Sequence, residues 1–308
     1  MFILEEQVKS FINYCACNKK LSPKTIKAYS IDLGQFIAFS DNDFTKDCLS
    51  RYIVSLHKIY KPKTVKRKIA CLKALSSYML YEEIIEKCPF AKIKTTFKEP
   101  FILPKSIPLE IIQEILSFAY RQLDCAKLTH HRKEIIIRDI AVLELLFATG
   151  ARVSEICNLK ISDTDLVNRS VKIYGKGSRE RIIQIENVDV LQALDTYYRL
   201  FSDRINDKGH FFINRLHNRL SEQSVRFMIK KYVEKTGCRS HITPHMFRHS
   251  FATLLLEEDV DIRYIQKLLG HSSITTTEIY THVSSTKQKE ILATRHPRNK
   301  IHIGTNEG

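Results

Sequence analysis

The sequence predicts a two-domain, mainly α-helical protein whose second domain also carries a small antiparallel sheet. Apolar residues recur at helical spacing through residues 1–87, a cluster of prolines interrupts this pattern over 88–108, and the period changes to two over 170–186. A chain of 308 residues is long enough for two separate cores. We therefore predict a helical N-terminal domain at 1–87, a linker at 88–108 and an α+β domain at 109–308 that ends in a tail.

Proline marks the start of two helices in the N-terminal domain. Ser22-Pro23 places a capping hydroxyl before a proline at the first helical position, and Lys61-Pro62 opens a second helix. The apolar residues that follow each start share one helix face. These residues are Ile26, Tyr29, Leu33 and Phe36 in the first helix, and Val65, Ile69, Leu72, Leu75 and Met79 in the second.

The second of these helices also carries a basic cluster, which consists of Lys66, Arg67, Lys68 and Lys73. We assign the cluster to the face opposite the apolar residues. Such a face is either a solvated helix surface or a surface that contacts phosphate groups. Both interpretations fit a domain this basic.

The second domain begins after a segment that cannot form a continuous helix, because it contains Pro89, Pro100, Pro104 and Pro108. Pro108 opens a new helix. A broadly apolar helix at 134–149 is expected to be buried and to end at Gly150. Alternating apolar residues on both sides of GKGSRE predict a hairpin at 170–186. Further helices are predicted at 188–200, 221–236, 244–258, 261–269 and, in the tail, near 284–294.

Composition restricts the class of protein. There are 49 Lys and Arg against 34 Asp and Glu, a formal net charge of +15 that favours a polyanionic partner. The eight cysteines include no CxxC pair, which indicates reduced thiols and no structural zinc site. Early acidic residues do not fit a secretory signal, and charges interrupt every long apolar run. We expect a soluble, cytoplasmic protein without a membrane span.

Six polar side chains in the second domain could together break and rejoin a phosphodiester without a metal. They supply two guanidiniums, two imidazoles, one ammonium and one phenol: Arg152, Lys176, His245, Arg248, His271 and Tyr280.

His245 and Arg248 lie three residues apart at the start of a helix that follows Thr243-Pro244. This spacing puts both on one face, where the helix N-terminus favours an anion. The alternative is a capping histidine and a surface arginine. His249 is four residues from His245, as metal ligands can be, but HMFRH lacks the glutamate of HExxH and Arg248 would repel a cation. We therefore take His249 as a structural histidine and expect no metal.

Arg152 follows the small residues Gly150 and Ala151, which would let a phosphate approach, and Glu155 could hold its guanidinium in a bidentate pair. A plain turn with a surface ion pair is the alternative. Lys176, between two glycines in the hairpin turn, could act as a general acid or be an ordinary turn lysine.

His271 and Tyr280 follow the last of the predicted helices before the tail. His271 comes directly after Gly270, whose left-handed conformation would project it, although a simple C-terminal capping histidine fits as well. Tyr280 has a phenol whose free pKa is about 10, so it needs a base and positive neighbours to act as a nucleophile. Otherwise it is a surface or core tyrosine.

Taken together, these segments resemble the tyrosine recombinases, also called phage-type integrases. The resemblance lies in GARVSEICNL, YGKGSRERIIQI, PHMFRHSFAT and LLGHSSITTTEIY, in that order. LSPKTIKAYSIDLGQF and KTVKRKIACLKALSSYM resemble the helical, SAM-like core-binding domain of the family. Xer-like and transposon or phage integrases are the most similar members. The resemblance implies a DNA breaking-rejoining fold for the second domain.

By the same resemblance, all six polar residues fall on catalytic positions of the family. Tyr280 is implied as the nucleophile that forms a 3′-phosphotyrosyl bond with DNA, while Arg152 and Arg248 hold the non-bridging oxygens.

The resemblance gives Lys176 the role of general acid and His245 the role of base. It further implies that His271 donates to a phosphate oxygen and that Glu155 supports the first arginine.

The resemblance also implies that no cofactor, ATP or metal is needed, that the substrate is double-stranded DNA, and that the chain assembles as a homotetramer on two duplexes. A tail that docks onto a neighbouring protomer is expected. The nearest alternative is a type IB topoisomerase, against which the N-terminal resemblance argues. A non-catalytic DNA-binding regulator and, more remotely, a metal hydrolase complete the alternatives.

Overall fold

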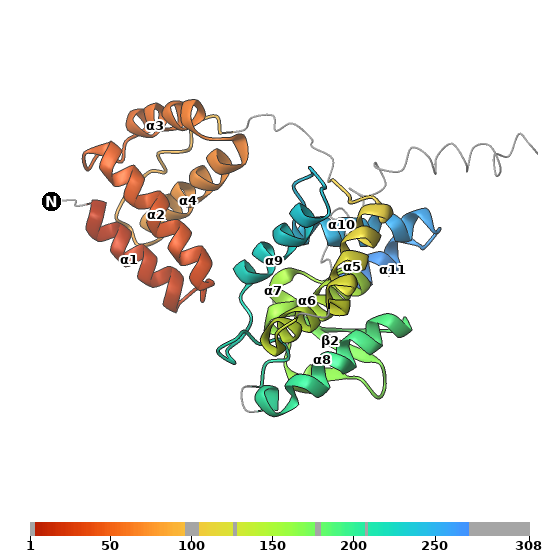
Figure 1. The fold of residues 1–308 in the computed structure, drawn as a ribbon. Helices are drawn as coiled ribbons and strands as arrows, with labels where there is room; N and C mark the ends of the chain where they lie inside the picture. Colours follow the sequence, from red (N-terminus) through yellow and green to blue (C-terminus); the bar gives the residue numbers. More distant parts are fainter. Residues whose placement is uncertain (1–3, 96–104, 126–127, 176–179, 207–208, 271–308) are drawn as a thin grey trace, which may run out of the picture. The chain divides into compact units, whose positions relative to one another are not determined.

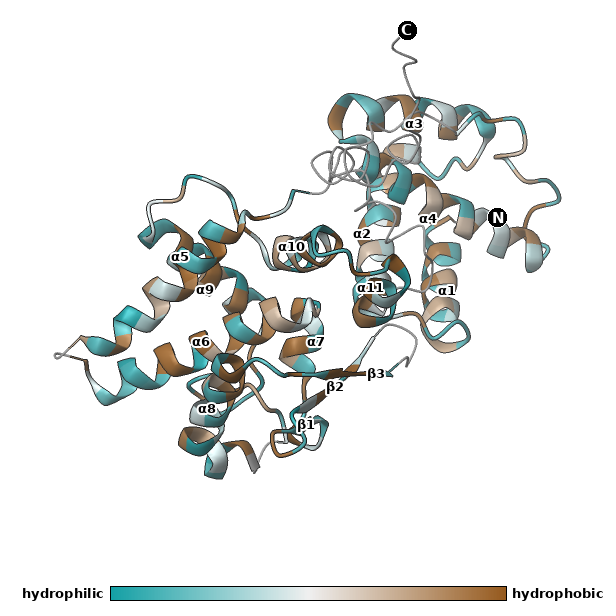
Figure 2. Cartoon of the chain, turned by 90° about the vertical axis from the view of Figure 1, so that its right-hand side faces the viewer, coloured by the Kyte–Doolittle hydropathy of each residue, from teal (hydrophilic) through white to brown (hydrophobic). Residues whose placement is uncertain are grey.

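The computed structural model describes residues 4–95, 105–125, 128–175, 180–206 and 209–270. The chain divides into two compact units, Met1–Phe101 and Ile102–Gly308 (Figure 1). In both units the helices alternate hydrophobic and hydrophilic residues along their length, as amphipathic helices around a core do (Figure 2). The helix predicted near 284–294 lies outside the described residues.

Four helices form the described part of the first unit: α1 (Leu4–Cys17), α2 (Pro23–Ser40), α3 (Lys46–Ile59) and α4 (Pro62–Tyr81). The two predicted helix starts are confirmed, since α2 and α4 both begin with proline in the first turn. The Ser22 hydroxyl accepts a hydrogen bond of 3.2 Å from the Thr25 N–H. All five apolar residues predicted on one face of α4 are buried in the core.

One member of the basic cluster on α4 does not lie where we expected. Lys68 is only 3% exposed, and its Nζ donates a hydrogen bond of 2.8 Å to the buried carboxylate of Asp32 on α2. The assignment of Lys68 to the exposed face is therefore wrong, because Asp32 supplies a counter-charge inside the unit. Lys66, Arg67 and Lys73 are exposed, although Arg67 also pairs with Asp32.

The segment after α4 contributes side chains to both units. Phe90 is buried in the first core and Ile93 packs against it, whereas Ile107 is buried in the second core. The predicted linker at 88–108 thus carries anchoring residues near each of its ends.

The second unit is built around α6, which contacts α5, α7, α8, α9 and α10 (Figure 1). Gly150 ends α6, as predicted, and adopts the left-handed conformation with φ of 57°. The helices and 3-10 turns of this unit are α5 (Leu109–Arg121), η1 (Gln122–Asp124), α6 (His130–Thr149), α7 (Val153–Asn158), η2 (Ile161–Asp163), α8 (Val188–Asn206), α9 (Glu222–Lys235), α10 (Pro244–Glu257) and α11 (Ile262–Leu269).

A three-stranded antiparallel sheet has the order β1-β2-β3, formed by Thr164–Asp165, Ser170–Tyr174 and Glu180–Gln184. The predicted hairpin is confirmed, with Val171 opposite Ile183 and Ile173 opposite Arg181. Val171, Ile173 and Ile183 face the core and are buried. The short β1 was not predicted, because two residues are too few to show a period.

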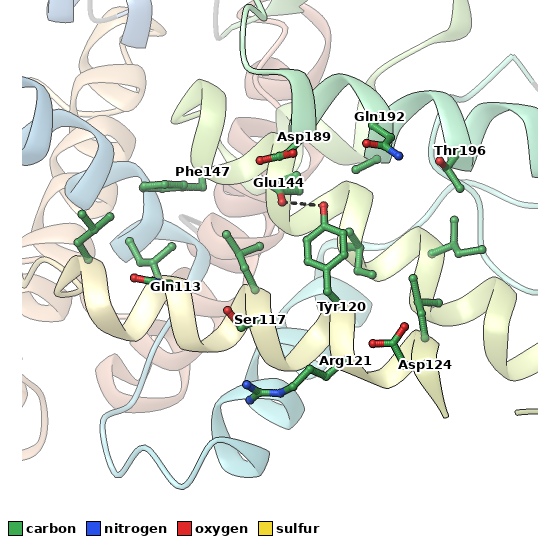
Figure 3. A pocket seen from close by; sticks show the side chains of 17 residues that line it. Gln113, Ser117, Tyr120, Arg121, Asp124, Glu144, Phe147, Asp189, Gln192 and Thr196 are labelled. Carbon is green, nitrogen blue, oxygen red and sulfur yellow. Dashed lines mark hydrogen bonds between the residues drawn. The ribbon is translucent and has the colours of Figure 1, made fainter. Parts of the chain in front are cut away.

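A cavity of about 890 Å³ lies between α5, α6 and α8 (Figure 3). Its walls are largely apolar, and inside it the Tyr120 hydroxyl donates a hydrogen bond of 2.9 Å to the carboxylate of Glu144. None of the described residues that we predicted for the phosphate site lines this cavity. Among the described helices, none combines the length and the hydrophobicity that crossing a bilayer requires.

Candidate phosphate-binding site

Three helices of the second unit meet at the end of α6. A Cβ at Gly150 would lie 2.5 Å from Cδ1 of Phe251 on α10 and 3.1 Å from Cδ2 of Leu269 on α11. The absence of a side chain therefore allows α10 and α11 to pack directly against the turn between α6 and α7. This packing places the GARVSE and PHMFRH segments at one location, although almost 100 residues separate them in the sequence.

Arg152 and Glu155 form the first pair at this location. The Arg152 Nη1 donates a hydrogen bond of 2.7 Å to Oε1 of Glu155, and the Arg152 backbone N–H donates one of 2.9 Å to Oε2. Burial alone would raise the pKa of Glu155, but hydrogen bonds and charge from Arg181, with the bonds from Arg152, bring that pKa below its usual value. The expected bidentate pair is not formed, because Oε2 serves other donors.

Arg181 on β3 is the residue that sequence reasoning missed. Its Nη2 donates a hydrogen bond of 2.7 Å to Oε2 of Glu155, and its Nε donates one of 2.7 Å to the carbonyl of Leu268 at the end of α11. Strand alternation could have identified it, since Arg181 lies two residues before the buried Ile183 and therefore on the same face of β3.

Arg248 joins α10 to the ends of α6 and α11. Its residue is 4% exposed, and its Nη1 and Nη2 donate hydrogen bonds of 2.8 Å to the Gly150 carbonyl and 2.7 Å to the Leu269 carbonyl. The last carbonyls of a helix carry partial negative charge, so a guanidinium at these positions is favourable. The guanidinium is thereby fixed beside the turn that leads to Arg152.

His245 lies one turn before Arg248, exposed at the start of α10, where Pro244 occupies the first helical position. Although His245 is exposed as a residue, neighbouring protein atoms displace part of the water around its imidazole, and this lowers the pKa of His245. The positive charges of Arg248, Arg226 and Arg152 lower that pKa further. Both predicted arginines are therefore close enough to act electrostatically on one imidazole. A depressed pKa keeps that imidazole neutral and able to accept a proton.

His249 lies one turn further along α10. Burial, followed by the charges of His245 and Arg248, lowers the pKa of His249 to about 4. His249 therefore stays neutral at physiological pH, which is consistent with the structural role that we predicted.

The structure thus brings together Arg152, Glu155, His245 and Arg248. The remaining predicted residues, Lys176, His271 and Tyr280, lie outside the described residues. Two guanidiniums and an imidazole thus lie next to the start of α10, and their positive charge suits the binding of a phosphate.

Comparison with known proteins identifies the family. Residues 106–287 match the model of the phage integrase family, and residues 8–83 match the N-terminal SAM-like domain of phage integrases. The chain is 50% identical to a tyrosine recombinase of Agathobacter rectalis, over 97% of this chain and 99% of that protein. It is 31% identical to tyrosine recombinase XerD of Halalkalibacterium halodurans, over 97% of this chain and all of that protein.

Solved structures share the fold. The crystal structure of XerH site-specific recombinase bound to palindromic difH substrate superimposes with a TM-score of 0.75, covering 94% of this chain and 84% of that chain at 21% identity. The predicted combination of a helical SAM-like domain with an α+β domain is thereby confirmed. The family models and the full-length relatives together establish that this chain belongs to the phage integrase family of tyrosine recombinases.

Proposed function

We propose that the chain is a site-specific DNA recombinase that cuts and rejoins strands through a 3′-phosphotyrosyl intermediate, with Tyr280 as the nucleophile. The observation that carries this proposal is the convergence of Arg152, His245 and Arg248 around the end of α6 in a chain of this family. The net charge of +15 supports a polyanionic substrate, which we take to be double-stranded DNA.

In the proposed reaction, the Tyr280 phenolic oxygen attacks the scissile phosphorus and the bond from phosphorus to the 5′ oxygen breaks. The phenolic proton passes to His245, which its lowered pKa keeps neutral. Lys176 supplies a proton to the departing 5′ oxygen. A 5′-hydroxyl of the second duplex then attacks the phosphotyrosyl phosphorus and gives its proton to Lys176, the bond to tyrosine breaks, and the phenol regains its proton from His245.

Arg152 and Arg248 stabilise the phosphorane that forms during each transfer. A five-coordinate phosphorus carries additional negative charge on its non-bridging oxygens, and preorganised guanidiniums bind that charge more tightly than they bind the ground state. The hydrogen bonds of Arg152 to Glu155 and of Arg248 to two carbonyls supply this preorganisation. Loss of one such donor costs about 10²–10³ in rate. His271 is proposed to add a further donor to a phosphate oxygen.

Strand exchange needs two DNA sites and therefore several protomers. A related integrase of the same fold has been solved as a tetramer bound to a Holliday junction, and we propose a homotetramer on two duplexes for this chain. The N-terminal domain at 1–87 and the domain at 109–308 would each contact the duplex, joined by the linker at 88–108. We place the enzyme in the cytoplasm, in agreement with its eight cysteines, none of which forms a disulfide.

Covalent capture tests the proposal. The full-length protein is incubated with fragmented genomic DNA of its host in EDTA and without ATP, denatured with detergent, and the covalent adducts are sequenced. We expect adducts enriched for one short DNA site, and no adducts from the Tyr280→Phe variant. Adducts spread over unrelated sequences, together with relaxation of any supercoiled plasmid, would instead indicate a topoisomerase.

A non-catalytic regulator would retain DNA without forming a covalent bond. To distinguish a regulator, the same incubation is followed by retention of protein–DNA complexes on a filter without detergent. A regulator would enrich a DNA site on the filter, and detergent would then release that DNA. Adduct formation that disappears with EDTA would contradict the metal-independent reaction.

A further inference from the structure

Arg181 links two parts of the candidate site, the Glu155 carboxylate on α7 and the end of α11. It lies on β3, the strand that follows Lys176 in the sequence, and its backbone is opposite Ile173 on β2. Its side chain is 10% exposed and reaches out of the sheet toward α7 and α11.

The contact with α7 goes through Glu155. The Glu155 side chain is 4% exposed and accepts bonds of 2.7 Å from both Arg152 and Arg181, one on each oxygen. A carboxylate held from both sides cannot rotate without breaking one bond. Together with the Arg152 backbone N–H, which also donates to Oε2, Arg181 fixes the orientation in which Glu155 presents Oε1 to the guanidinium of Arg152.

The contact with α11 goes to its last turn. The Arg181 Nε holds the Leu268 carbonyl, and Arg248 holds the carbonyl of the next residue, Leu269. Two guanidiniums from different elements therefore fix the end of the helix that leads into His271. The packing there is tight, because a Cβ at Gly270 would lie 3.0 Å from Nη1 of Arg181 and 3.3 Å from its Cδ.

We propose that Arg181 is a positioning residue for the recombination reaction, which acts by orienting Arg152 through Glu155 and by fixing the end of α11 before His271. This inference rests on the proposed function. It assigns to Arg181 no contact with DNA or with the scissile phosphorus. Because displacement of a reacting group by about 1 Å can cost 10²-fold in rate, the effect of removing Arg181 should appear in the chemical step.

Single-turnover cleavage tests the inference. A nicked duplex that carries the captured DNA site is mixed with excess protein, and the rate constant of adduct formation and the dissociation constant of the duplex are measured separately. We expect Arg181→Gln to lower the rate constant by about 10–100-fold and to change the dissociation constant by less than about threefold. Arg181→Lys should recover part of the rate, since an ammonium can restore the bond to Glu155 or to Leu268 but not both.

A double-mutant cycle identifies the path through Glu155. If Arg181 acts by holding Glu155, Arg181→Gln and Glu155→Gln together should lower the rate constant by clearly less than the product of the two single effects. Arg199→Gln is the matched control, because it removes an exposed arginine paired with Asp195 on α8. Its rate constant should equal that of the wild type, and circular dichroism should show the same helix content in all variants.

The outcomes separate the two proposals. Absence of any wild-type adduct contradicts the proposed function, whatever Arg181 does. A wild type that forms adducts while Arg181→Gln cleaves at an unchanged rate overturns the inference alone. A rise in the dissociation constant with an unchanged rate constant also overturns it, because Arg181 would then act on DNA binding. Strictly multiplicative effects in the cycle overturn it as well, because Arg181 would then act independently of Glu155.

Discussion

The guanidinium of Arg248 donates a hydrogen bond of 2.8 Å from Nη1 to the backbone carbonyl of Gly150, two residues before Arg152. One side chain therefore connects the segment that carries the first arginine to the helix that carries the second. Any change that separates the end of α6 from α10 should alter the positions of both guanidiniums together.

Gly150→Ala should destabilise the second unit strongly. The new Cβ would lie 2.5 Å from Cδ1 of Phe251, in a backbone conformation with φ of 57°. Gly237→Ala provides a matched control, because Gly237 also has a positive φ, 72°, but has no atom within 4 Å of a Cβ. We expect the control to cost about 1 kcal/mol of unfolding free energy, and Gly150→Ala to cost about 1–3 kcal/mol more.

Urea unfolding followed by circular dichroism measures both variants. Equal losses would mean that α10 moves away from Phe251 without penalty, and would contradict the tight packing at this turn. The same preparations should differ in adduct formation, with Gly150→Ala inactive and Gly237→Ala close to the wild type.

Much of this architecture is predictable from local signals in the sequence. Pro23 and Pro62 mark helix starts because proline fixes φ, and Gly150 marks a helix end because glycine readily adopts a positive φ. The pairing of Arg152 with Glu155 follows from the three-residue spacing. The same reasoning could have placed Lys68 on the buried face, since it lies three residues after Val65.

Long-range pairings are the part that sequence reasoning did not reach. The burial of Lys68 is compensated by Asp32, and Arg181 finds Glu155 26 residues away and Leu268 87 residues away. From the sequence, a basic residue among apolar ones is expected to be exposed, because the acidic residue that would pair with it in the core cannot be identified. Only the three-dimensional arrangement supplies that partner.

Glu144→Gln should stabilise the second unit at pH 7. Burial raises the pKa of Glu144, and the charge of Asp189 raises it further, so the carboxylate is unfavourable beside the cavity (Figure 3). A glutamine retains the acceptor for Tyr120 and removes the charge. Glu134→Gln, on the same helix, should instead destabilise the second unit at pH 7. A hydrogen bond of 2.7 Å from Arg204 lowers the pKa of Glu134 despite burial, so the carboxylate is favourable there.

The stability that Glu144→Gln gains over the wild type should decrease as the pH is lowered. A carboxyl whose folded-state pKa is raised binds its proton in the folded state first, so lowering the pH favours the folded wild type. The difference in unfolding free energy between Glu144→Gln and wild type should therefore shrink as pH falls through the raised pKa. A difference that grows toward acid pH would show that the charge is not the cause.

His245 should titrate below the ordinary histidine pKa of about 6.5 in the free protein. Arg226 lowers the pKa of His245 and Glu222 raises it. Arg226→Gln should therefore move the pKa of His245 upward, and Glu222→Gln should move it downward. The two residues lie four apart on α9, which makes them controls for each other.

Proton NMR of the imidazole measures this titration, with the His245 signal assigned by its loss in His245→Gln. Shifts of the same sign in the two variants would mean that packing rather than charge sets the pKa of His245. Under the proposed reaction, Arg226→Gln should also displace the acid limb of the adduct-formation rate to higher pH.

Lys66 and Lys68 should give opposite phenotypes although they are two residues apart on α4. Lys66 is exposed, and we predict that it contacts a DNA phosphate together with Arg67 and Lys73. Lys66→Gln should weaken binding of the duplex similarly for all sequences, reduce the slope of log affinity against log salt by about 1, and leave unfolding unchanged.

Lys68→Gln removes a buried partner of Asp32, so it should lower the unfolding free energy of the first unit, by up to about 3–5 kcal/mol. Fluorescence anisotropy at several salt concentrations and urea unfolding separate the two effects. A reduced salt slope in Lys68→Gln at full stability would return Lys68 to the DNA-contacting face and contradict the burial of its ammonium.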